Sequence, residues 1–600
     1  MKYELLGFND TNNPIPTVLS NRGIDDYNGY VNIDETVKED WELIHNMRKG
    51  VELLGHHIVQ GNKIAVDIDP DADGLTSAAQ LCLVIKRHWD RADLEWILPE
   101  GKKHELDYNS IPKGTKLVIT PDSGSNEFAF HKKCKENGID VLVIDHHLTP
   151  QESEDAVVIN NQLSPDYSNK TMTGAGMVNK FIEALDSYMN TNYAPDYYDL
   201  VSIGLVADAA PMVNDETRWY VWEGLKTKQN KLLEEMYNSS DYNDGHNRDM
   251  TRISFTIAPK FNAAFRMADK EVLSQVFESM LGKEGLIEYK YRKEIKQRSY
   301  AKDTLAKLTS LHNKSKKIKK EGLEGAKLSI SKSDVDKRPI LLVENKLDVP
   351  SEMNGLIAMG LSKDYRRPVL FMKEGEDGIL RGSGRGFERT LPDFRGFLES
   401  TKLFEYAQGH ANAFGAAIKK SNIQKFYEVV DQHFETLVEE PVLVDFVFDG
   451  TTPNQFFMNE IDNNSHYFGR GVEAPSVILD NLVINTEDLK LSTSGAKLDI
   501  QMGDVDLVFF QSCGDLQEIY DDLRETGYKV KIRVLGEPKI SHFARKHRSN
   551  IVVQEFEILE VVNKEKPKFG TSGANPFAKS TTGENPFATT VKNKSSNMLF

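Results

Sequence analysis

The chain has 600 residues, of which 39% are hydrophobic and 28% charged, and its formal net charge is −17. A chain of this length exceeds a single core, so we expect three or four domains. No apolar stretch approaches the roughly 20 residues of a membrane span, and the N-terminus lacks the apolar core of a signal peptide. Three widely spaced cysteines indicate neither a disulfide framework nor a cysteine zinc site, so a cytoplasmic location without membrane association is expected.

A basic segment interrupts this acidic chain. Between Lys283 and Lys320 there are 13 Lys or Arg residues and four Asp or Glu residues. Nucleic-acid binding depends on local patches of charge, so the negative total does not exclude a nucleic-acid partner. Taken alone, a solvated helix with a basic loop explains the segment equally well.

Short, β-branched apolar runs follow an N-terminal extension that shows no chemical signature and is expected to pack on the first domain. The runs end in Asp, Asn or His, and helix-compatible stretches separate them. This alternation predicts a parallel α/β sheet, which binds ligands beyond the carboxyl ends of its strands. The extension is residues 1–60, the expected strands are 63–69, 116–122, 140–147 and 156–160, and the expected helices are 74–89 and 125–138.

The later part of the chain changes its pattern three times. A glycine turn opens a helix at 173–185, and the basic stretch 288–313 favours a long connector helix. A second α/β pattern begins at residue 338, and alternating strands from about residue 440 indicate a small β-barrel. The last 38 residues are polar and are expected to be disordered. Their repeat, "ANPFA" then "ENPFA", is either a spacer or a docking site for a partner.

Four stretches offer carboxylate or imidazole groups at the ends of apolar runs. Alone, each signal is weak, because an acid at a strand end is more often a helix N-cap. An Asp-His-His triplet after a buried strand is stronger, since the carboxylate can orient a metal-binding imidazole. The stretches are "DIDPDADG", "TPDSG", "IDHH" and "LVADAAP", which contain Asp67, Asp69, Asp71, Asp73, Asp122, Asp145, His146, His147 and Asp208.

The first three of these stretches should meet at one edge of the predicted sheet. Carboxylates and imidazoles without cysteine suit Mn²⁺ or Mg²⁺, and there are enough ligands for two ions. Two metals about 4 Å apart are the usual apparatus of phosphoester hydrolysis. A solvated surface loop would leave the coincidence of these groups unexplained.

In this order, "DADG", "DSG", "DHH" and "VAD" resemble the motifs of the DHH phosphoesterase superfamily, best those of its RecJ-type single-strand exonucleases. The resemblance covers roughly residues 60–560 and implies a monomeric, Mn²⁺- or Mg²⁺-dependent 5′-to-3′ exonuclease that cuts single-stranded DNA in recombination, repair or replication. It also implies a sequence of domains. These are a DHH catalytic domain (61–280), a basic helical connector (281–335), a second α/β domain of the DHHA1 type (336–440), an OB-like β-barrel domain (441–562) and a disordered tail (563–600).

The resemblance implies roles for individual residues. Asp122 would bridge two ions, and Asp69 would lie in or beside the ligand shell. His147 would lie close to the metals or the phosphate, beside Asp145, and His410 in "GHANAFGAAI" would contact the scissile phosphate. The remaining metal ligands would be Asp71, Asp73, His146 and Asp208.

The same resemblance implies a site for the 5′ phosphate of the DNA. Arg266 lies in "PKFNAAFRMAD", and Ser383 and Arg385 lie in "RGSGRG", which resembles a family loop; an ordinary turn is the other reading. Arginine forks suit a terminal phosphate because they bind it in bidentate fashion. Two positions depart from the family pattern, Phe265 and Gln408, each standing where relatives have Gly, and both could change the DNA channel.

Two other functions remain open at this point. A DHH hydrolase could act on short oligonucleotides or cyclic dinucleotides, although such relatives are typically smaller. An inactive RecJ-like scaffold in a replication complex usually loses ligands, whereas every expected ligand position is filled here. Because no Walker-type loop is present, a separate helicase or single-strand-binding protein is the expected supplier of unwound DNA, docking through the tail.

Overall fold

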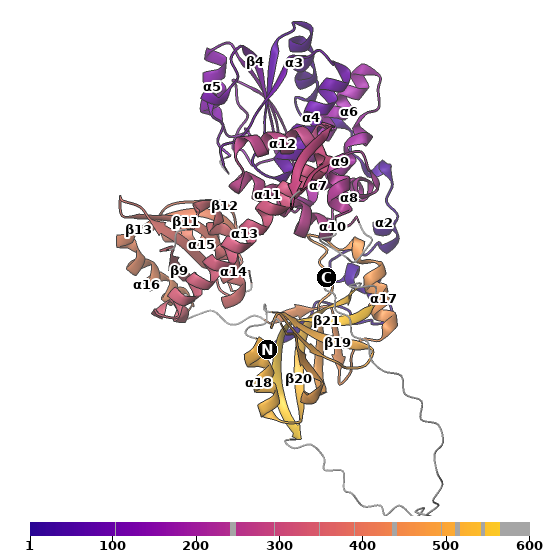
Figure 1. Ribbon diagram of the computed structural model, residues 1–600, viewed down its shortest axis with the longest axis vertical. Coiled ribbons are helices and arrows are strands. Elements are labelled where there is room, and N and C mark those ends of the chain that lie inside the picture. Colours follow the sequence, from indigo (N-terminus) through magenta and orange to yellow (C-terminus); the bar gives the residue numbers. More distant parts are fainter. Residues whose placement is uncertain are drawn as a thin grey trace, which may run out of the picture.

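The computed structural model describes residues 1–101, 104–239, 248–292, 294–346, 349–388, 390–434, 441–493, 495–510, 516–541 and 547–563. Three larger sheets form within this part of the chain, and the long helix α13 (Tyr300–Ile330) runs from the first toward the second (Figure 1). No helix of these residues is long and apolar enough to cross a membrane. The tail repeat, which we expect to be either a spacer or a docking site, lies outside the described residues.

The first sheet is parallel throughout, as predicted, and its strand order is β3-β2-β4-β5-β6. The chain passes from β2 to β3 on one side and then to β4 on the other, so the order reverses between β2 and β4. Ligands of open α/β sheets bind at such a reversal, beyond the carboxyl ends of the strands. The strands are β2 (Lys63–Asp67), β3 (Leu94–Ile97), β4 (Thr115–Pro121), β5 (Asp140–Asp145) and β6 (Val157–Asn160).

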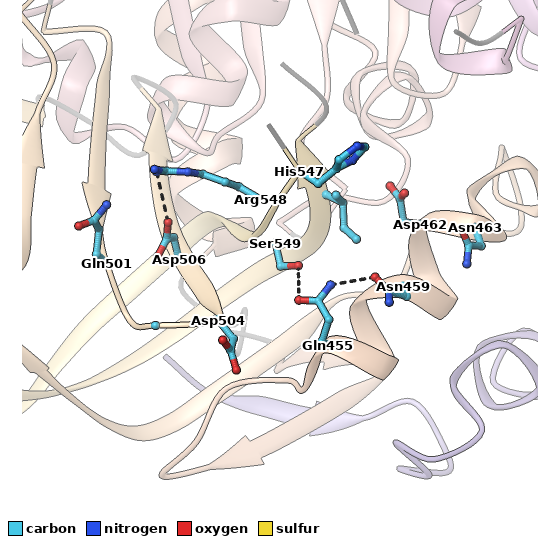
Figure 2. A pocket seen from close by; sticks show the side chains of 12 residues that line it. Gln455, Asn459, Asp462, Asn463, Gln501, Asp504, Asp506, His547, Arg548 and Ser549 are labelled. Carbon is cyan, nitrogen blue, oxygen red and sulfur yellow. Dashed lines mark hydrogen bonds and ion pairs between the residues drawn. The ribbon is translucent and has the colours of Figure 1, made fainter. Parts of the chain in front are cut away.

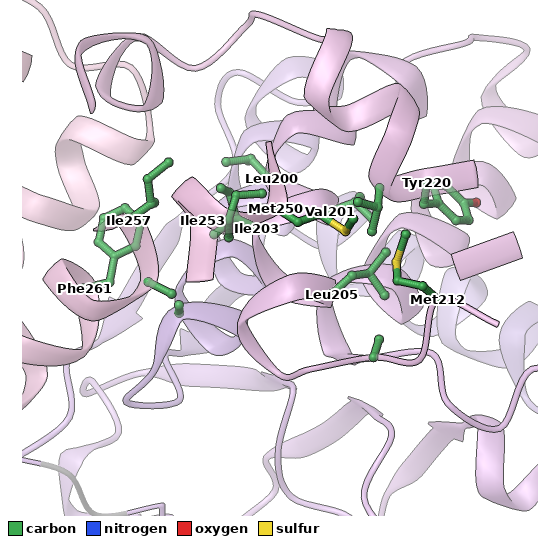
Figure 3. Packing of buried hydrophobic residues seen from close by; sticks show 14 of the residues in the cluster. Leu200, Val201, Ile203, Leu205, Met212, Tyr220, Met250, Ile253, Ile257 and Phe261 are labelled. Carbon is green, nitrogen blue, oxygen red and sulfur yellow. The ribbon is translucent and has the colours of Figure 1, made fainter. Parts of the chain in front are cut away.

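Helices pack around this sheet, and α7 is the most deeply buried of them. Its sequence "YDLVSIGLVA" is apolar on every side, as a helix inside a core must be. Leu200, Ile203 and Leu205 pack with Ile253 and Phe261 in one continuous core (Figure 3). This packing fixes the C-terminal end of α7, where Asp208 stands.

The helices of this part are α3 (Met47–Val59), α4 (Ala72–His88), α5 (Phe128–Glu136), α6 (Gly174–Met189), α7 (Tyr198–Ala207), α8 (Asp215–Lys226), α9 (Lys231–Tyr237), α10 (Met250–Arg252), α11 (Ala258–Met267) and α12 (Lys270–Met280). A π-helical turn, η6 (Ile253–Ile257), joins α10 to α11.

The connector begins differently from our prediction. The expected helix over 288–313 is wrong in its first part, because β7 (Leu286–Tyr291) and β8 (Glu294–Ser299) form an antiparallel hairpin before α13 starts. The Lys296 ammonium lies 4.8 Å from the ring centre of Tyr291, and the Arg298 guanidinium lies 4.3 Å from that of Tyr289. Such cross-strand cation–aromatic pairs favour the hairpin over a helix.

The second sheet is mixed, with the order β12-β13-β11-β10-β9. The stretch "RGSGRG", which we expected to be a loop or a turn, instead forms most of strand β11. A Cβ atom on Gly384 would lie 2.4 Å from the Phe414 ring, and one on Gly382 would lie 2.1 Å from the Phe371 carbonyl oxygen. The two glycines therefore allow close packing within a sheet rather than a turn.

The strands of the second sheet are β9 (Leu341–Glu344), β10 (Val369–Glu374), β11 (Ile379–Arg385), β12 (Phe404–His410) and β13 (Ala413–Lys419). Its helices are α14 (Asn354–Tyr365), α15 (Phe394–Thr401) and α16 (Ile423–Phe434).

The C-terminal part forms a seven-stranded sheet with the order β15-β16-β20-β21-β19-β18-β17. The pairings between its described residues do not join β15 to β17, so the expected OB-like barrel is not confirmed. A polar pocket of about 900 Å³ lies between α17 (Gln455–Asn463) and the ends of three strands (Figure 2). The strands are β15 (Phe446–Asp449), β16 (Val477–Asn485), β17 (Leu489–Leu491), β18 (Lys497–Ile500), β19 (Val505–Phe510), β20 (Lys529–Ser541) and β21 (Arg548–Asn563), and α18 (Leu516–Thr526) precedes β20.

The N-terminal residues contact both ends of the molecule. Strand β1 (Tyr3–Leu5) pairs in parallel with β14 (Val442–Val444), and the Arg22 guanidinium forms an ion pair with Asp445. Helices α1 (Pro14–Ser20) and α2 (Tyr27–Val31) follow, and the Tyr30 hydroxyl donates to the Tyr467 carbonyl oxygen. Helix α3, in contrast, packs on α6 and β6 of the first domain. The extension thus joins the first and last parts of the chain.

Candidate metal centre

Asp73 lies in the first turn of α4 and is held by the start of another helix. Its side chain accepts hydrogen bonds from the Gly174 N–H (2.9 Å), the Ala175 N–H (3.0 Å) and the Thr173 hydroxyl (3.1 Å). The positive end of the α6 dipole favours a carboxylate there. A Cβ atom on Gly204 would come within 2.1 Å of Asp73 Oδ1, so the carboxylate also needs glycine on α7. Asp73 is therefore fixed by two helices besides its own.

The other acids of this loop have different surroundings. Asp71 caps α4 by accepting from the Asp73 N–H (3.0 Å) and the Gly74 N–H (3.1 Å). Asp69 is buried, its Oδ2 lies 2.9 Å from His104 Nδ1, and burial raises its pKa to about 6 despite that contact. Burial, together with the charge of Asp69, raises the pKa of Asp67 to about 7. Of these three side chains, Asp69 and Asp71 lie close enough to Asp122 to form with it a group that could hold an ion.

Asp122 follows β4 in a left-handed backbone conformation, with a φ of 66°. Its N–H donates to the Ile144 carbonyl oxygen at 2.8 Å, which ties the turn to β5. Its Oδ1 is buried and has no hydrogen bond within the described part of the chain, although His146 Nε2 lies 3.1 Å away. A buried carboxylate oxygen that has no hydrogen bond and faces an imidazole nitrogen suits a cation shared by the two.

Asp145 ends β5 and anchors the two histidines that follow it. It accepts hydrogen bonds from the N–H groups of Ser125 (3.0 Å) and His146 (2.7 Å), and its Oδ1 lies 2.8 Å from His147 Nδ1. Burial opposes its ionisation, but the hydrogen bond and the charge of His147 outweigh burial and hold the pKa of Asp145 well below its usual range. Asp145 is thus a fixed anion that orients His147.

The adjacent histidines have opposite electrostatic properties. Burial, together with the charge of His147, lowers the pKa of His146 to about 4, so its imidazole is neutral at pH 7, which is the form that binds metals. Burial alone would also lower the pKa of His147, but the hydrogen bond with Asp145 raises it to about 9. His147 is therefore a cation at neutral pH.

Asp208 completes the group from the C-terminal end of α7. Its Oδ2 lies 3.8 Å from His146 Nε2. Burial, and after it the charge of Asp71, raises the pKa of Asp208 to about 6. Burial and the charge of Asp208 raise the pKa of Asp73 to about 8, and burial and the charge of Asp73 raise that of Asp122 well above its usual range. These acids repel one another, and a divalent cation would relieve that repulsion.

Oxygen and nitrogen ligands without sulfur fit Mn²⁺ or Mg²⁺, so the residues present suit the expected metal. Asp122 and His146 each belong to two of the sets of side chains that could hold an ion. In each set the ligand atoms lie within 4.8 Å of one another. The sets are Asp122 with Asp145, His146 and His147; Asp73 with His146 and Asp208; and Asp69 with Asp71 and Asp122.

Residues expected at the DNA phosphates lie on α11 and on the second sheet. Arg266 is largely buried, which lowers its pKa, while the charge of Asp71 acts in the other direction. Burial, and after it the charge of Arg266, lowers the pKa of Arg385, so the two guanidiniums lie near each other. A Cβ atom on Gly355 would lie 2.5 Å from Arg385 Nη2 and 3.6 Å from Ser383 Oγ, so these two side chains share one face.

His410 stands at the end of β12 and connects the second sheet with the acidic edge. Burial lowers its pKa, and the next largest cause is the charge of His147. The fold thus brings all the expected site residues toward one region between the first two sheets, although they are distributed over more than 300 positions from Asp69 to His410.

A family model described as the DHH family, N-terminal domain, matches residues 63–205. The chain is 33% identical over 577 residues to YorK of Bacillus subtilis (strain 168), which is named as an SPbeta prophage-derived single-strand DNA-specific exonuclease, and the match covers 94% of this chain and 100% of that protein. The chain is a RecJ-like member of the DHH family. It is 26% identical over 544 residues to the single-stranded-DNA-specific exonuclease RecJ of Bacillus subtilis (strain 168), a match that covers 86% of this chain and 64% of that protein.

The RecJ-like fold extends over most of the chain. The structure of RecJ from Thermus thermophilus in complex with Mn²⁺ matches with a TM-score of 0.68 at 19% identity, covering 94% of this chain and 80% of that one. The same protein in complex with Mg²⁺ matches with a TM-score of 0.64 at 18% identity, covering 94% and 78%. The predicted α/β class and the resemblance to the DHH superfamily are therefore confirmed.

Three basic residues beside the RecJ-like centre were not predicted from the sequence. His104 contacts Asp69 from a loop after β3 that has no distinctive pattern. Arg470 influences the pKa values of both Asp208 and His410 by its charge, and its carbonyl oxygen accepts from the Met212 N–H at 2.7 Å. Arg395 acts on His410 in the same way. Of these three residues, only Arg470 stands in a recognisable sequence pattern, because it lies between two glycines in "YFGRGVEAP".

Proposed function

We propose that this chain is a metal-dependent exonuclease that degrades single-stranded DNA from the 5′ end to the 3′ end. The observation that carries the proposal is the meeting of buried acids with one neutral and one charged imidazole at the edge of the first sheet, with two neighbouring guanidiniums on α11 and the second sheet. The names of YorK and RecJ support the substrate, because both describe nucleases specific for single-stranded DNA. The RecJ structures with Mn²⁺ and Mg²⁺ support the use of a divalent metal.

In this proposal, five side chains would hold two ions, and Asp122 would contribute to both. They are Asp71, Asp73, Asp122, His146 and Asp208, and Asp69 lies beside them. When bound, two divalent ions would supply the Lewis-acid chemistry and the activated water that phosphodiester hydrolysis requires. Mutual repulsion among these buried carboxylates favours ion binding, because the ions replace protons that the acids otherwise retain.

The charged His147 binds and orients the scissile phosphate. Its Nδ1–H donates to Asp145 Oδ1, which leaves the Nε2–H to donate to a phosphate oxygen. Asp145 therefore acts through His147 rather than on the DNA. His410, at the end of β12 in the second sheet, is proposed to contact the same phosphate.

The two arginines explain the 5′ polarity in this proposal. Arg266 and Arg385 lie close enough that each opposes the charge of the other, and a phosphate between them would remove that repulsion. The Ser383 hydroxyl lies on the same face and can donate to the same anion. A terminal 5′ phosphate carries more charge than an internal phosphodiester, so this pair would favour a phosphorylated 5′ end.

The test is a cleavage assay on a single-stranded 30-mer labelled at the 5′ or the 3′ end, with Mn²⁺, Mg²⁺ or a chelator. We expect mononucleotides from the 5′-labelled strand at the first time points, progressive shortening of the 3′-labelled strand, and no cleavage with the chelator. Shortening from the 3′ end would contradict the polarity. Faster cleavage of a dinucleotide than of the 30-mer would favour the small-substrate hydrolase. The monomeric state, the cytoplasmic setting, the role in recombination, repair or replication and the partner of the tail remain predictions.

A further inference from the structure

A cavity of about 600 Å³ lies on the second-domain side of Arg266. The end of α11, one face of α13 and the short helix η8 (Ser351–Met353) enclose it. Helix α13 contributes Lys314, Ile318 and Glu321, whose spacing of four and three residues places them on the same side of the helix. The volume falls within the range of about 300–1,000 Å³ that is usual for sites of small organic groups.

The walls of this cavity combine apolar and charged side chains. The apolar part of the lining comes from Met267, Ile318, Val349, Pro350 and Met353, and about as much of the lining is polar. The cations Arg266 and Lys314 lie among them, and Glu321 is the acid that lines the cavity. Such a mixed lining suits a flat heteroaromatic ring, whose faces pack on apolar groups such as the Met267 thioether while its polar edge meets charged groups. Several phosphate groups would need more donors than two cations beside the Glu321 carboxylate provide.

The walls are fixed by packing rather than by the ligand. Met353 is 1% exposed, and the Ser315 hydroxyl contacts its sulfur at 3.6 Å. A Cβ atom on Gly322 would lie 2.5 Å from Ile357 Cδ1, so α13 approaches α14 closely at the cavity. The cavity is therefore formed before any ligand arrives.

Arg266 connects this cavity to the region between the metal centre and Arg385. A nucleotide whose 5′ phosphate lies on the two arginines, and whose 3′ phosphate lies on the metals, must direct its base away from that line. We infer that the cavity binds the base of the 5′-terminal nucleotide, an inference that rests on the proposed function.

Two variants fill the cavity from opposite walls. Val349→Phe adds a ring from the turn before η8, and Glu321→Trp adds one from the exposed side of α13. Leu328→Phe is the matched control, because Leu328 is 56% exposed on α13 and does not line the cavity. Two fillers from separate elements keep the test valid if one of them fails to fold.

The assay compares initial rates on 5′-phosphorylated single strands with Mn²⁺. The first substrate is intact, the second has an abasic residue at the 5′ end, and the third has the abasic residue at the fifth position. For the wild type, we expect KM to rise about tenfold for the abasic end and to change less than about twofold for the internal abasic residue, as for loss of one group from an apolar pocket. Both cavity-filling variants should raise KM for the intact strand until it is about equal to KM for the strand with the abasic 5′ end. Leu328→Phe should retain the wild-type ratio of these two KM values.

A second readout does not depend on cleavage. In the Asp122→Ala protein, a 2-aminopurine at the 5′ end should change its fluorescence on binding, and adding Val349→Phe should remove that change. Equal KM values for intact and abasic ends would overturn the inference, as would a ratio that both fillers leave intact. A preference for a 5′-triphosphate over a monophosphate would identify a phosphate site and also overturn it. If no strand is cut, the proposed function fails, and the 2-aminopurine signal still decides on the cavity.

Discussion

Two regions of the molecule gather aspartates, and only one of them has the properties of a metal site. The sheet edge beyond β2 and β4 collects Asp73 and Asp122, which are 2% and 3% exposed. The pocket of the C-terminal part is also lined by acids, among them Asp504 and Asp506 (Figure 2). There, Asp506 accepts from the Met502 N–H at 3.3 Å and lies 3.7 Å from the Arg548 guanidinium.

The cause of the difference lies in the fold rather than in the number of acids. Parallel strands end at one edge, and the start of α6 adds N–H donors that hold a carboxylate there without neutralising it. In the C-terminal pocket, amide side chains satisfy one another, as where Gln455 donates to Asn459 and accepts from Ser549. Within the described residues, none of the pocket's acids belongs to a group that could hold a metal. An acid that could bind metal therefore differs from an ordinary surface acid in two ways: its side chain is buried, and one of its oxygens has no hydrogen bond.

The largest expected effect is a loss of cleavage, and it should distinguish a variant at the metal edge from a variant in the C-terminal pocket. Asp122→Ala should lower the cleavage rate on the order of a thousandfold or more, because it removes the proposed shared ligand. Its affinity for single-stranded DNA, measured by fluorescence anisotropy, should change little. Asp504→Ala, the control in the C-terminal pocket, should cleave within about twofold of the wild type. Equal loss of activity in both variants would remove the distinction between the regions.

Addition of metal should show, in the absence of DNA, which of the two regions binds it. Mn²⁺ at about 100 times its Kd should stabilise the folded protein by about 2.7 kcal/mol, and a chelator should reverse the effect. The increase in Tm, followed by scanning calorimetry, should persist in Asp504→Ala and be largely lost in Asp122→Ala. An increase that Asp122→Ala retains would place the metal elsewhere in the molecule.

The third expected effect concerns the end of the DNA. Arg385→Ala should reduce the preference for a 5′-phosphorylated strand by about tenfold to a hundredfold, the usual effect of losing a charge-assisted hydrogen bond. Arg381 on the same strand is a matched control, because it is exposed and bonded to Asp377. Cleavage rates on strands with and without the 5′ phosphate measure the preference of Arg385→Ala and of the control Arg381→Ala. An unchanged preference in Arg385→Ala would contradict our explanation of polarity.

The metal edge was the part of the molecule that could be predicted best from the sequence. Strand ends in "DIDPDADG" and "IDHH" carry their acids and imidazoles in a local pattern, and a parallel sheet brings such ends together. The different charge states of His146 and His147 could not be predicted, because they depend on which ring touches Asp145. His104 was missed because its contact with Asp69 joins two loops that are distant in the sequence.

Prediction was weaker where tertiary contacts override local preference. The stretch 286–299 is basic and contains helix-forming residues, yet it folds as a hairpin whose Tyr289 and Tyr291 pack against cations on the partner strand. "RGSGRG" has a turn-like composition, but Phe414 packs where side chains on its glycines would lie. The pairing of β1 with β14 joins residues more than 400 positions apart, and no local pattern can indicate it.

The smallest expected effect contrasts two helical glycines. Gly204 faces Asp73 and Ala175, and the Cβ of Gly204→Ala would lie 2.4 Å from the Ala175 Cβ, so we expect a loss of about 1–3 kcal/mol in stability and a weaker response to Mn²⁺. Gly55 on α3 has no atom within 4 Å of such a Cβ, so Gly55→Ala should gain about 0.5–1 kcal/mol from helix propensity alone. Thermal unfolding with and without Mn²⁺ measures both. If Gly204→Ala were as stabilising as Gly55→Ala, Asp73 would not be confined by α7, and the rigidity of the metal edge would have another origin.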